Sequence, residues 1–407
     1  MKILFVLDSI HIGGPLSYTS GLVNFLNKKG FECIVMGGRG DTFKFAEEYL
    51  QKANIISYPI IKKSSFITKV NIIWQTFLNF SRVIKKQKPD VIHLSSTLSA
   101  LGVLLSPLSW PYPKVSSFHG GWDLETDSVI KILGYYDRLS LAGRIKHKLK
   151  LHLLWILQRY CLQSVDKIIV LSQYAKKMVL EHFKVTKAKV ELLYGGVDPA
   201  IYFPSRSKKQ AKKALFIDPK CKLLSIVARP DPRKGFHLAL KAVSKLNKKN
   251  PKFKLIIGVP NLNSFYLSEL AKLYKSLGYT QSISFQLTLS IEDKVKLLQA
   301  TDIFLMCSIR LETFGLTTLE AFSCGAIVIG TPTGATPEIL KPISKFNLMT
   351  KGISVKSLVH KIEEVALLSP EKTREIQRKG REYSKREFSW ERSLESLPTI
   401  YLKVVKK

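Results

Sequence analysis

The sequence predicts an α/β protein with two doubly wound domains in tandem. Short apolar runs alternate with longer amphipathic segments along the 407 residues. Strands separated by helices in this way pair in parallel through right-handed crossovers. The alternation stops once, at the polar, basic and proline-containing segment 203–209, and then starts again. We interpret this segment as a linker, because a chain of this length exceeds one typical domain.

Apolar runs with the length of buried strands mark the sheet of each predicted domain. In the first half they are residues 3–7, 32–36, 91–94, 114–118, 167–171 and 190–193. In the second half they are residues 223–228, 254–258, 283–285, 303–306 and 327–330. The first run is interpreted as a strand and not as a signal peptide, because Asp8 ends it and no small-residue cleavage site follows.

Amphipathic segments between these runs predict the helices. They are residues 17–29, 70–86 and 147–163 in the first half, and 237–248, 267–277, 291–300, 317–323 and 355–368 in the second. Two doubly wound domains in tandem predict a ligand cleft between them, beyond the carboxyl ends of the strands.

The composition indicates that the protein binds a polyanionic partner. The formal net charge of +33 suits nucleic acid, an anionic membrane face or a phosphate-bearing substrate, and solvated lysine faces are the alternative. We expect no nucleic-acid partner, because the lysines are spread along the chain and no nucleic-acid module is recognisable. The five scattered cysteines form no disulfide or zinc pattern and favour the cytoplasm. No apolar stretch has the length of a membrane span.

The largest group of candidate functional residues follows the apolar run that ends near Met306. Arg310 and Glu312 lie in a loop, Gly315 permits close approach of the backbone, and a helix begins near Thr317. A helix amino-terminus exposes unpaired N–H groups that suit a diphosphate. Glu320, deeper in this helix, suits two ribose hydroxyls, and Glu312 suits the sugar. The alternative is that Glu312 pairs with the helix dipole and Glu320 lies on a solvated face of the helix.

A second cluster follows the run 223–228. The loop 229–235 contains two prolines, projects cations and ends at Gly235, which opens the next helix. Arg229 and Lys234, five positions apart, are interpreted as a diphosphate clamp, since arginine offers a planar fork and lysine a point charge. A basic surface turn is the alternative. Both clusters are expected at the ends of neighbouring strands of one sheet.

Together these motifs resemble retaining glycosyltransferase family 4. The carriers of the resemblance are Glu312 and Glu320 with seven residues between them, Arg229 with Lys234-Gly235, the turn 334–338, the segments 170–174 and 196–198, and Phe388-Ser389-Trp390. The resemblance covers nearly the whole chain. It departs from the family at Gly195, where an asparagine is common.

The resemblance implies a GT-B fold, with two Rossmann-like domains facing a cleft. Residues 1–203 would be the acceptor side and residues 204–385 the nucleotide-sugar donor side, and residues 386–407 a helix that crosses back to the first domain. It also implies transfer with retention at the anomeric carbon, from a UDP- or GDP-sugar to a glycan or lipid-linked acceptor. Bacterial surface polysaccharide or lipopolysaccharide assembly is the expected pathway.

The resemblance also assigns roles to residues. Arg229 and Lys234 would hold the donor diphosphate, Glu312 the sugar hydroxyls and Glu320 the ribose. The backbone of Phe314, Gly315 and Leu316 would face the phosphate or sugar. No cofactor is expected, and no metal, because the chain has no Asp-X-Asp pair suited to bridging a metal and a diphosphate.

The first half contributes two further candidates. Gly13-Gly14 follows the first strand, and the resemblance assigns this loop to closing over the donor. His119 follows the run 114–118 beside two glycines, and the matching histidine of the family lies near the reacting sugar. A plain turn and a structural histidine are the alternatives. Asp123, Glu125 and Asp127 are expected in a loop on the acceptor side.

Residues 141–157 predict a helix that contacts a membrane. Ile145, Leu149, Leu153 and Ile156 fall on one side, and Arg144, Lys146, Lys148 and Lys150 flank it, which is the pattern of an interfacial helix on anionic lipid. Trp74, Phe77 and Phe80, followed by Lys85-Lys86, form a weaker second candidate. The alternative is a core helix with snorkelling lysines.

Three other functions remain open. A glycan phosphorylase has a similar fold, but no lysine for pyridoxal phosphate is identifiable. A catalytically inactive nucleotide-sugar-binding protein would not need Arg229, Lys234, Glu312 and Glu320 intact. A glycosidase with two carboxylates would not need phosphate-binding cations beside them.

Overall fold

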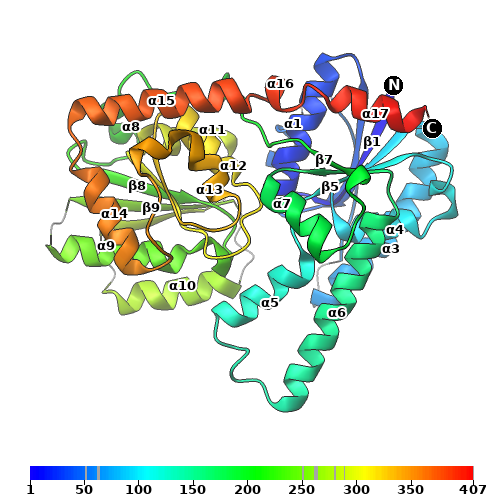
Figure 1. Ribbon diagram of the computed structural model, residues 1–407, viewed down its shortest axis with the longest axis horizontal. Helices are drawn as coiled ribbons and strands as arrows, with labels where there is room; N and C mark the ends of the chain where they lie inside the picture. Colours follow the sequence, from blue (N-terminus) through cyan, green and yellow to red (C-terminus); the bar gives the residue numbers. More distant parts are fainter. Residues whose placement is uncertain are drawn as a thin grey trace. The chain divides into compact units, whose positions relative to one another are not determined.

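The computed structural model describes residues 1–50, 53–61, 65–249, 252–260, 265–278, 281–287 and 289–406. The chain divides into two compact units (Figure 1). Unit 1 comprises Met1–Asp127, Arg138–Gly195 and Ser393–Lys407, and unit 2 comprises Ser128–Asp137 and Gly196–Arg392. The boundaries at residues 203 and 385 that the sequence suggests stay a prediction.

Unit 1 contains a parallel sheet of seven strands in the order β3-β2-β1-β4-β5-β6-β7. The strands are β1 (Lys2–Ile10), β2 (Glu32–Arg39), β3 (Asn54–Tyr58), β4 (Val91–Leu94), β5 (Lys114–Phe118), β6 (Lys167–Val170) and β7 (Val190–Leu192). Residues 3–7 of β1 and all of β4 are buried. Burial on both faces of a parallel sheet explains why these strands lack the apolar–polar alternation of a half-exposed strand.

The helices of the first half connect these strands. They are α1 (Gly14–Lys28), α2 (Phe43–Glu47), α3 (Ser65–Gln87), α4 (Thr97–Leu104), α5 (Trp122–Ile132), α6 (Leu141–Gln163) and α7 (Gln173–Lys177). α1 begins at Gly14 because Pro15 occupies its first turn, where no backbone N–H is needed. It therefore starts three residues earlier than predicted.

Unit 2 contains a parallel sheet of five strands in the order β10-β9-β8-β11-β12, with helices on both faces (Figure 1). The strands are β8 (Lys222–Val227), β9 (Phe253–Val259), β10 (Ile283–Leu287), β11 (Ile303–Met306) and β12 (Ile327–Gly330). The helices are α8 (Lys208–Ala214), α9 (Phe236–Lys249), α10 (Phe265–Ser276), α11 (Ile291–Ala300), α12 (Leu316–Ser323), α13 (Thr336–Leu340), α14 (Val355–Ala366), α15 (Pro370–Phe388) and α16 (Trp390–Ser393).

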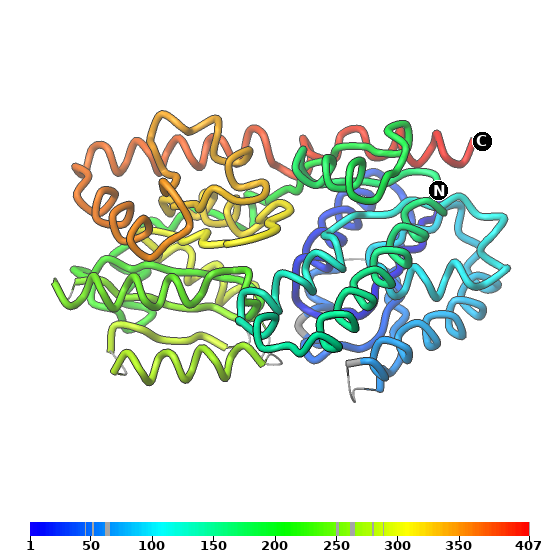
Figure 2. The backbone as a smooth tube through the Cα atoms, turned by 60° about the horizontal axis from the view of Figure 1, so that its bottom comes forward, coloured from blue at the N-terminus to red at the C-terminus, as the bar shows by residue number. Residues whose placement is uncertain are grey.

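The last helix, α17 (Leu397–Val405), belongs to unit 1, so both chain ends lie there (Figure 2). The hydroxyl of Tyr401 is 2.5 Å from Nδ1 of His93, and Nε2 of His93 is 2.7 Å from the Ser117 hydroxyl. Burial lowers the pKa of His93 to about 3. This histidine is therefore neutral and holds α17 on the sheet.

The predicted fold class, two doubly wound parallel sheets, is confirmed. All eleven predicted strands exist, with bounds that differ by a few residues. The elements that lack a counterpart among the predicted ones are β3, at the sheet edge, and the helices α2, α4, α5, α7, α8, α13 and α15. The predicted linker is partly wrong, because α8 begins at Lys208 with Ser207 as its N-cap.

Candidate active site

The loop after β8 is braced by an ion pair inside it. Nη2 of Arg233 lies 2.6 Å from Oδ2 of Asp231, and Asp231 also accepts the backbone N–H of Arg233. Burial raises the pKa of Asp231, but the Arg233 charge and its hydrogen bonds hold it below its usual value. Arg233 is buried, so this cation stiffens the loop and does not project from it.

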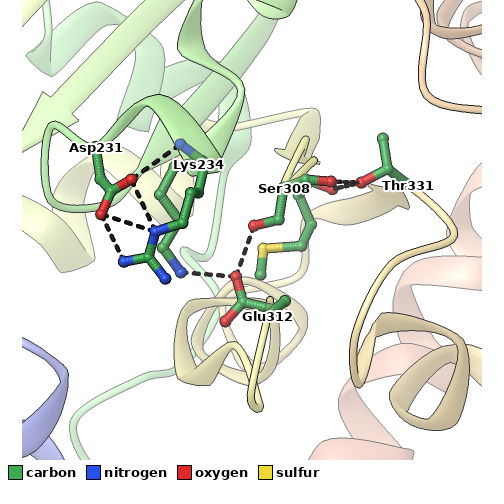
Figure 3. Close-up of polar contacts among 7 residues, drawn as sticks. Asp231, Lys234, Ser308, Glu312 and Thr331 are labelled. Carbon is green, nitrogen blue, oxygen red and sulfur yellow. Dashed lines mark hydrogen bonds and ion pairs between the residues drawn. The ribbon is translucent and has the colours of Figure 1, made fainter. Parts of the chain in front are cut away.

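Lys234 reaches from this loop to the loop after β11. Its Nζ donates to Oε2 of Glu312 over 2.7 Å, and the Ser308 hydroxyl donates to the same oxygen over 2.6 Å. Figure 3 shows Lys234 and Ser308 converging on this one carboxylate oxygen. β8 and β11 are parallel neighbours, so their carboxyl ends bring the two loops together as predicted.

The charge of Glu312 is fixed by these partners. Burial raises the pKa of Glu312, but Lys234 and the hydrogen bond from Ser308 hold it below its usual value. The carboxylate is therefore ionised at neutral pH and the pair with Lys234 is charged on both sides. Arg229, in the same loop, is exposed and adds a positive charge to the rim of the cluster.

Backbone contacts join three loops at this edge of the sheet. Ile309 donates its N–H to the carbonyl oxygen of Arg233, and Ala335 donates to that of Glu312, each over 2.7 Å. The Thr331 hydroxyl, just after β12, donates to the carbonyl oxygen of Ser308 (Figure 3). The position of Glu312 thus depends on loops that follow β8, β11 and β12.

Glycines make this close approach possible. Gly235 and Gly334 have φ angles of 71° and 57°, and a Cβ on either would collide with a carbonyl oxygen, that of Cys307 or that of Glu312. Leu311, beside Glu312, also has a positive φ, 54°. A branched residue in this region of φ is strained. The loop that carries Glu312 is therefore held in an unfavourable backbone conformation by its neighbours.

Gly334→Ala tests this arrangement. We expect it to reduce the free energy of unfolding by at least about 2 kcal/mol, because the left-handed φ and the collision with the Glu312 carbonyl oxygen act together. Urea denaturation measures the loss. Gly352→Ala is the control, since a Cβ there meets only the Ser357 hydroxyl at 3.8 Å. Equal stability of the two variants would contradict the interlocked loops.

The helix α12 begins directly after Gly315, with φ 91° at its N-cap. The Phe314 side chain is buried, with its ring 6.0 Å from that of Phe388. The Phe314 side chain therefore packs inside unit 2, so a role for this segment toward the donor would fall to its backbone. The orphan N–H groups of the first turn are a site for an anion.

Glu320 is buried in α12 and pairs with a residue that sequence reasoning missed. Nζ of Lys294, on α11, lies 2.9 Å from Oε1 of Glu320, and the other oxygen, Oε2, has no hydrogen-bond partner among the described residues. A buried carboxylate oxygen without a partner is rare in a folded protein. It is the kind of acceptor that a ligand hydroxyl would satisfy.

The other residues that sequence reasoning missed are partners of the predicted ones: Ser308, Asp231, Arg233 and Thr331. Only Asp231 and Arg233 carried a signal, since an aspartate two residues before an arginine in a proline-rich loop fits an internal brace. Arg233 was not among the predicted site residues, and the structure buries it in an ion pair with Asp231.

In unit 1, His119 lies directly after β5 with its ring 5.6 Å from that of Tyr18. Gln158 of α6 holds the loop that follows. Its amide donates to the Gly120 carbonyl over 2.8 Å and accepts the Trp122 N–H over 2.7 Å. The second candidate of unit 1 is the Gly13-Gly14 loop after β1. Gly13 is the N-cap of α1, and a Cβ on Gly14 would meet open space.

The predicted acceptor-side loop with Asp123, Glu125 and Asp127 is wrong, because all three lie in α5. Asp123 and Glu125 occupy its first turn, where a helix favours negative charge. Asp123 lies 2.7 Å from Nε2 of His182, and Asp127 lies 3.2 Å from Nε2 of His147. These carboxylates therefore connect α5 to its neighbours in unit 1.

The described residues contain no group of three or more His, Cys, Asp or Glu side chains that could hold a metal ion. No helix in the described part of the chain has the length and apolar character needed to cross a membrane.

Two parallel doubly wound sheets with this cation–carboxylate cluster are the architecture of the GT-B glycosyltransferases. The chain belongs to glycosyltransferase family 4, since residues 12–201 match "Glycosyltransferase Family 4" and residues 207–383 match "Glycosyl transferases group 1". The predicted family and fold are thus confirmed.

Individual relatives are distant. D-inositol 3-phosphate glycosyltransferase of Mycobacterium marinum is 28% identical over 44% of this chain and 38% of its own length. The chain spans between 38% and 66% of the first curated relatives that it matches.

Among solved structures, Anabaena Alr3699/HepE in complex with UDP and glucose has a TM-score of 0.78 at 17% identity, covering 99% of this chain and 100% of that chain. WaaG, a glycosyltransferase involved in lipopolysaccharide biosynthesis, has a TM-score of 0.72 at 16% identity, covering 98% and 99%. These similarities concern the fold.

Proposed function

We propose that this protein transfers a sugar, with retention at the anomeric carbon, from a nucleoside diphosphate sugar bound by unit 2. The observation that carries the proposal is the Lys234–Glu312 pair, with Arg229 exposed in the same loop. Breaking the bond between the anomeric carbon and the phosphate oxygen leaves negative charge on the departing diphosphate. Fixed cations and helix N–H groups stabilise such charge.

In this proposal Arg229 supplies most of the net positive charge. The Lys234 charge is balanced by Glu312 over 2.7 Å, but a lysine has three N–H donors, and only one is needed for Glu312. The others suit a phosphate oxygen. The N–H groups at Leu316 and Thr317, in the first turn of α12, suit the same diphosphate.

Glu312 and Glu320 are assigned to hydroxyl groups of the donor. Oε2 of Glu312 is occupied by Lys234 and Ser308, which leaves the lone pairs of Oε1 for a sugar hydroxyl. Oε2 of Glu320 would accept a ribose hydroxyl. His119 is assigned to the reacting sugar and Gly13-Gly14 to the loop over the donor, as the family resemblance implies.

The acceptor in this proposal is a glycan or a lipid-linked glycan of the bacterial surface. WaaG, whose fold is similar, acts in lipopolysaccharide biosynthesis. UDP-sugars are the first donors to test, since Alr3699/HepE binds UDP and glucose, and GDP-sugars are the second.

Thermal unfolding with nucleotide sugars tests the donor assignment. A ligand at one hundred times its Kd stabilises the folded state by about 2.7 kcal/mol, so a UDP-, GDP- or ADP-sugar of the right class raises the melting temperature. We expect Glu320→Gln to weaken this shift for the nucleotide sugar. No shift with any of the three would contradict the proposal. Sugar phosphate formation from a glycan and phosphate would show a phosphorylase instead.

A further inference from the structure

The long helix α6 exposes its apolar side. Leu149 and Leu153 are 65% and 56% exposed, and the residues that continue this stripe one turn apart are also exposed: Leu141, Ile145, Ile156 and Tyr160. In Figure 1 the amino-terminal part of α6 extends beyond the rest of unit 1. The predicted alternative, a core helix with snorkelling lysines, is wrong, because the leucines themselves face outward.

The opposite face of α6 is buried and already holds its own apolar residues. The buried residues are His147, Leu154, Gln158, Cys161 and Leu162. His147 pairs with Asp127, and Gln158 makes both of its hydrogen bonds to the loop after His119. An ordinary surface helix has apolar residues only toward the core, whereas α6 has a second apolar stripe that faces away from the core. The exposed stripe of α6 is therefore available to something outside the unit.

Cations flank this stripe, and carboxylates are absent from the helix. Arg144 and Lys148 lie along one edge of it, Lys146 and Lys150 along the other, and all four are exposed. The 23 residues of α6 contain no Asp or Glu. An aliphatic stripe between two rows of lysine and arginine is complementary to anionic lipid, whose acyl chains and phosphates lie at different depths.

The neighbouring helix α3 has the same character. Phe66, Val70, Trp74 and Leu78, spaced by one turn, are exposed, and α3 also contains cations but no carboxylate. α3 and α6 both pack against α4. Lys69 of α3 is close enough to Lys150 of α6 for the two charges to interact. Two adjacent helices of unit 1 thus expose apolar residues among cations.

We propose that α6 lies flat in the interface of an anionic bilayer, with its exposed leucine and isoleucine side chains among the acyl chains and its lysines on lipid phosphates. A protein partner fits less well, because the cores of protein interfaces are depleted in lysine. Nucleic acid offers no apolar surface for the stripe. The inference does not depend on the proposed transfer reaction, since it uses none of the donor-site residues.

Vesicle sedimentation with the full chain tests the proposal. We expect binding to mixed phosphatidylcholine–phosphatidylglycerol vesicles and weak binding to pure phosphatidylcholine. Leu149→Ser/Leu153→Ser should weaken binding at least about tenfold, because two buried apolar side chains are lost. Its control is Leu367→Ser/Leu402→Ser, which replaces two leucines that are exposed elsewhere and should bind as the wild type.

A charge-reversed triple variant tests the electrostatic part. Lys146→Glu/Lys148→Glu/Lys150→Glu should weaken binding at least about a hundredfold, since each lysine near an anionic surface contributes about 1 kcal/mol. The control, Lys241→Glu/Lys245→Glu/Lys248→Glu on α9, makes the same change of net charge at exposed positions and should bind at least tenfold more tightly than the α6 variant.

Three results would overturn the proposal: no binding of the wild type to anionic vesicles, equal binding of each α6 variant and its control, or self-association that Leu149→Ser/Leu153→Ser abolishes. The last would make the stripe an interface between two copies of the chain. All replaced residues are exposed, so the melting temperatures of the variants should match the wild type and exclude misfolding.

Discussion

Arg229→Ala is expected to lower the rate of sugar transfer by about two to three orders of magnitude, the usual effect of removing one group that stabilises developing negative charge. Arg229 is exposed, in a loop braced by the Asp231–Arg233 pair. Its removal therefore leaves the fold intact. Steady-state transfer rates and the melting temperature measure the two effects separately.

The control for this variant is Arg381→Ala, which removes an exposed arginine from α15 in the same unit. It should change neither activity nor stability. If Arg229→Ala and Arg381→Ala transfer sugar equally fast, Arg229 has no role at the diphosphate.

Lys234→Ala is expected to affect both activity and stability. It removes a cation from the proposed diphosphate site and leaves the Glu312 carboxylate buried beside Ser308 without its counter-charge. Breaking a buried ion pair on one side costs about 3 kcal/mol of folding stability. Transfer should also fall by at least about a hundredfold. Urea denaturation and transfer assays provide the two measurements.

The double variant Lys234→Met/Glu312→Gln separates the two effects. It removes both charges and keeps similar volume, so stability should return toward that of the wild type. Activity should stay low, because the cation and the sugar-binding carboxylate are both absent. Recovery of activity together with stability would mean that the pair has only a structural role.

The same pair has a defined dependence on pH. The folded state holds the pKa of Glu312 below its ordinary value of 4.5, so its contribution to stability is complete above that value. It is lost as the pH falls below 4.5 and through the folded-state pKa. The wild type should lose more stability than Glu312→Gln between neutral pH and pH values below 4.5, as measured by urea denaturation at each pH.

The sheets were predictable because their central strands are buried on both faces. Runs such as 3–7 and 303–306 are apolar throughout, so their composition and length identify them without tertiary information. β3 was missed because it is an edge strand that is only partly buried. α5 was mistaken for a loop because its carboxylates, Asp123 and Asp127, find their histidine partners only in the folded protein.

The candidate site was predictable in its residues but not in its pairing. Arg229, Lys234, Glu312 and Glu320 follow from their positions after strands and around a helix start. The contact of Lys234 with Glu312 joins residues 78 positions apart, and that of Lys294 with Glu320 joins two helices. No local pattern encodes such distances, so the sequence predicted Lys234 as a phosphate ligand without its carboxylate.

The interlocked loops around Glu312 also constrain which insertions and deletions related proteins can accept. Surface loops ordinarily tolerate insertions and deletions, but here the backbones after β8, β11 and β12 are hydrogen-bonded to one another at Arg233, Ile309, Glu312 and Ala335. One added residue would break these bonds and shift Glu312 relative to Lys234. Related proteins with other donors are thus expected to keep these loop lengths and to differ in the side chains that point into the site.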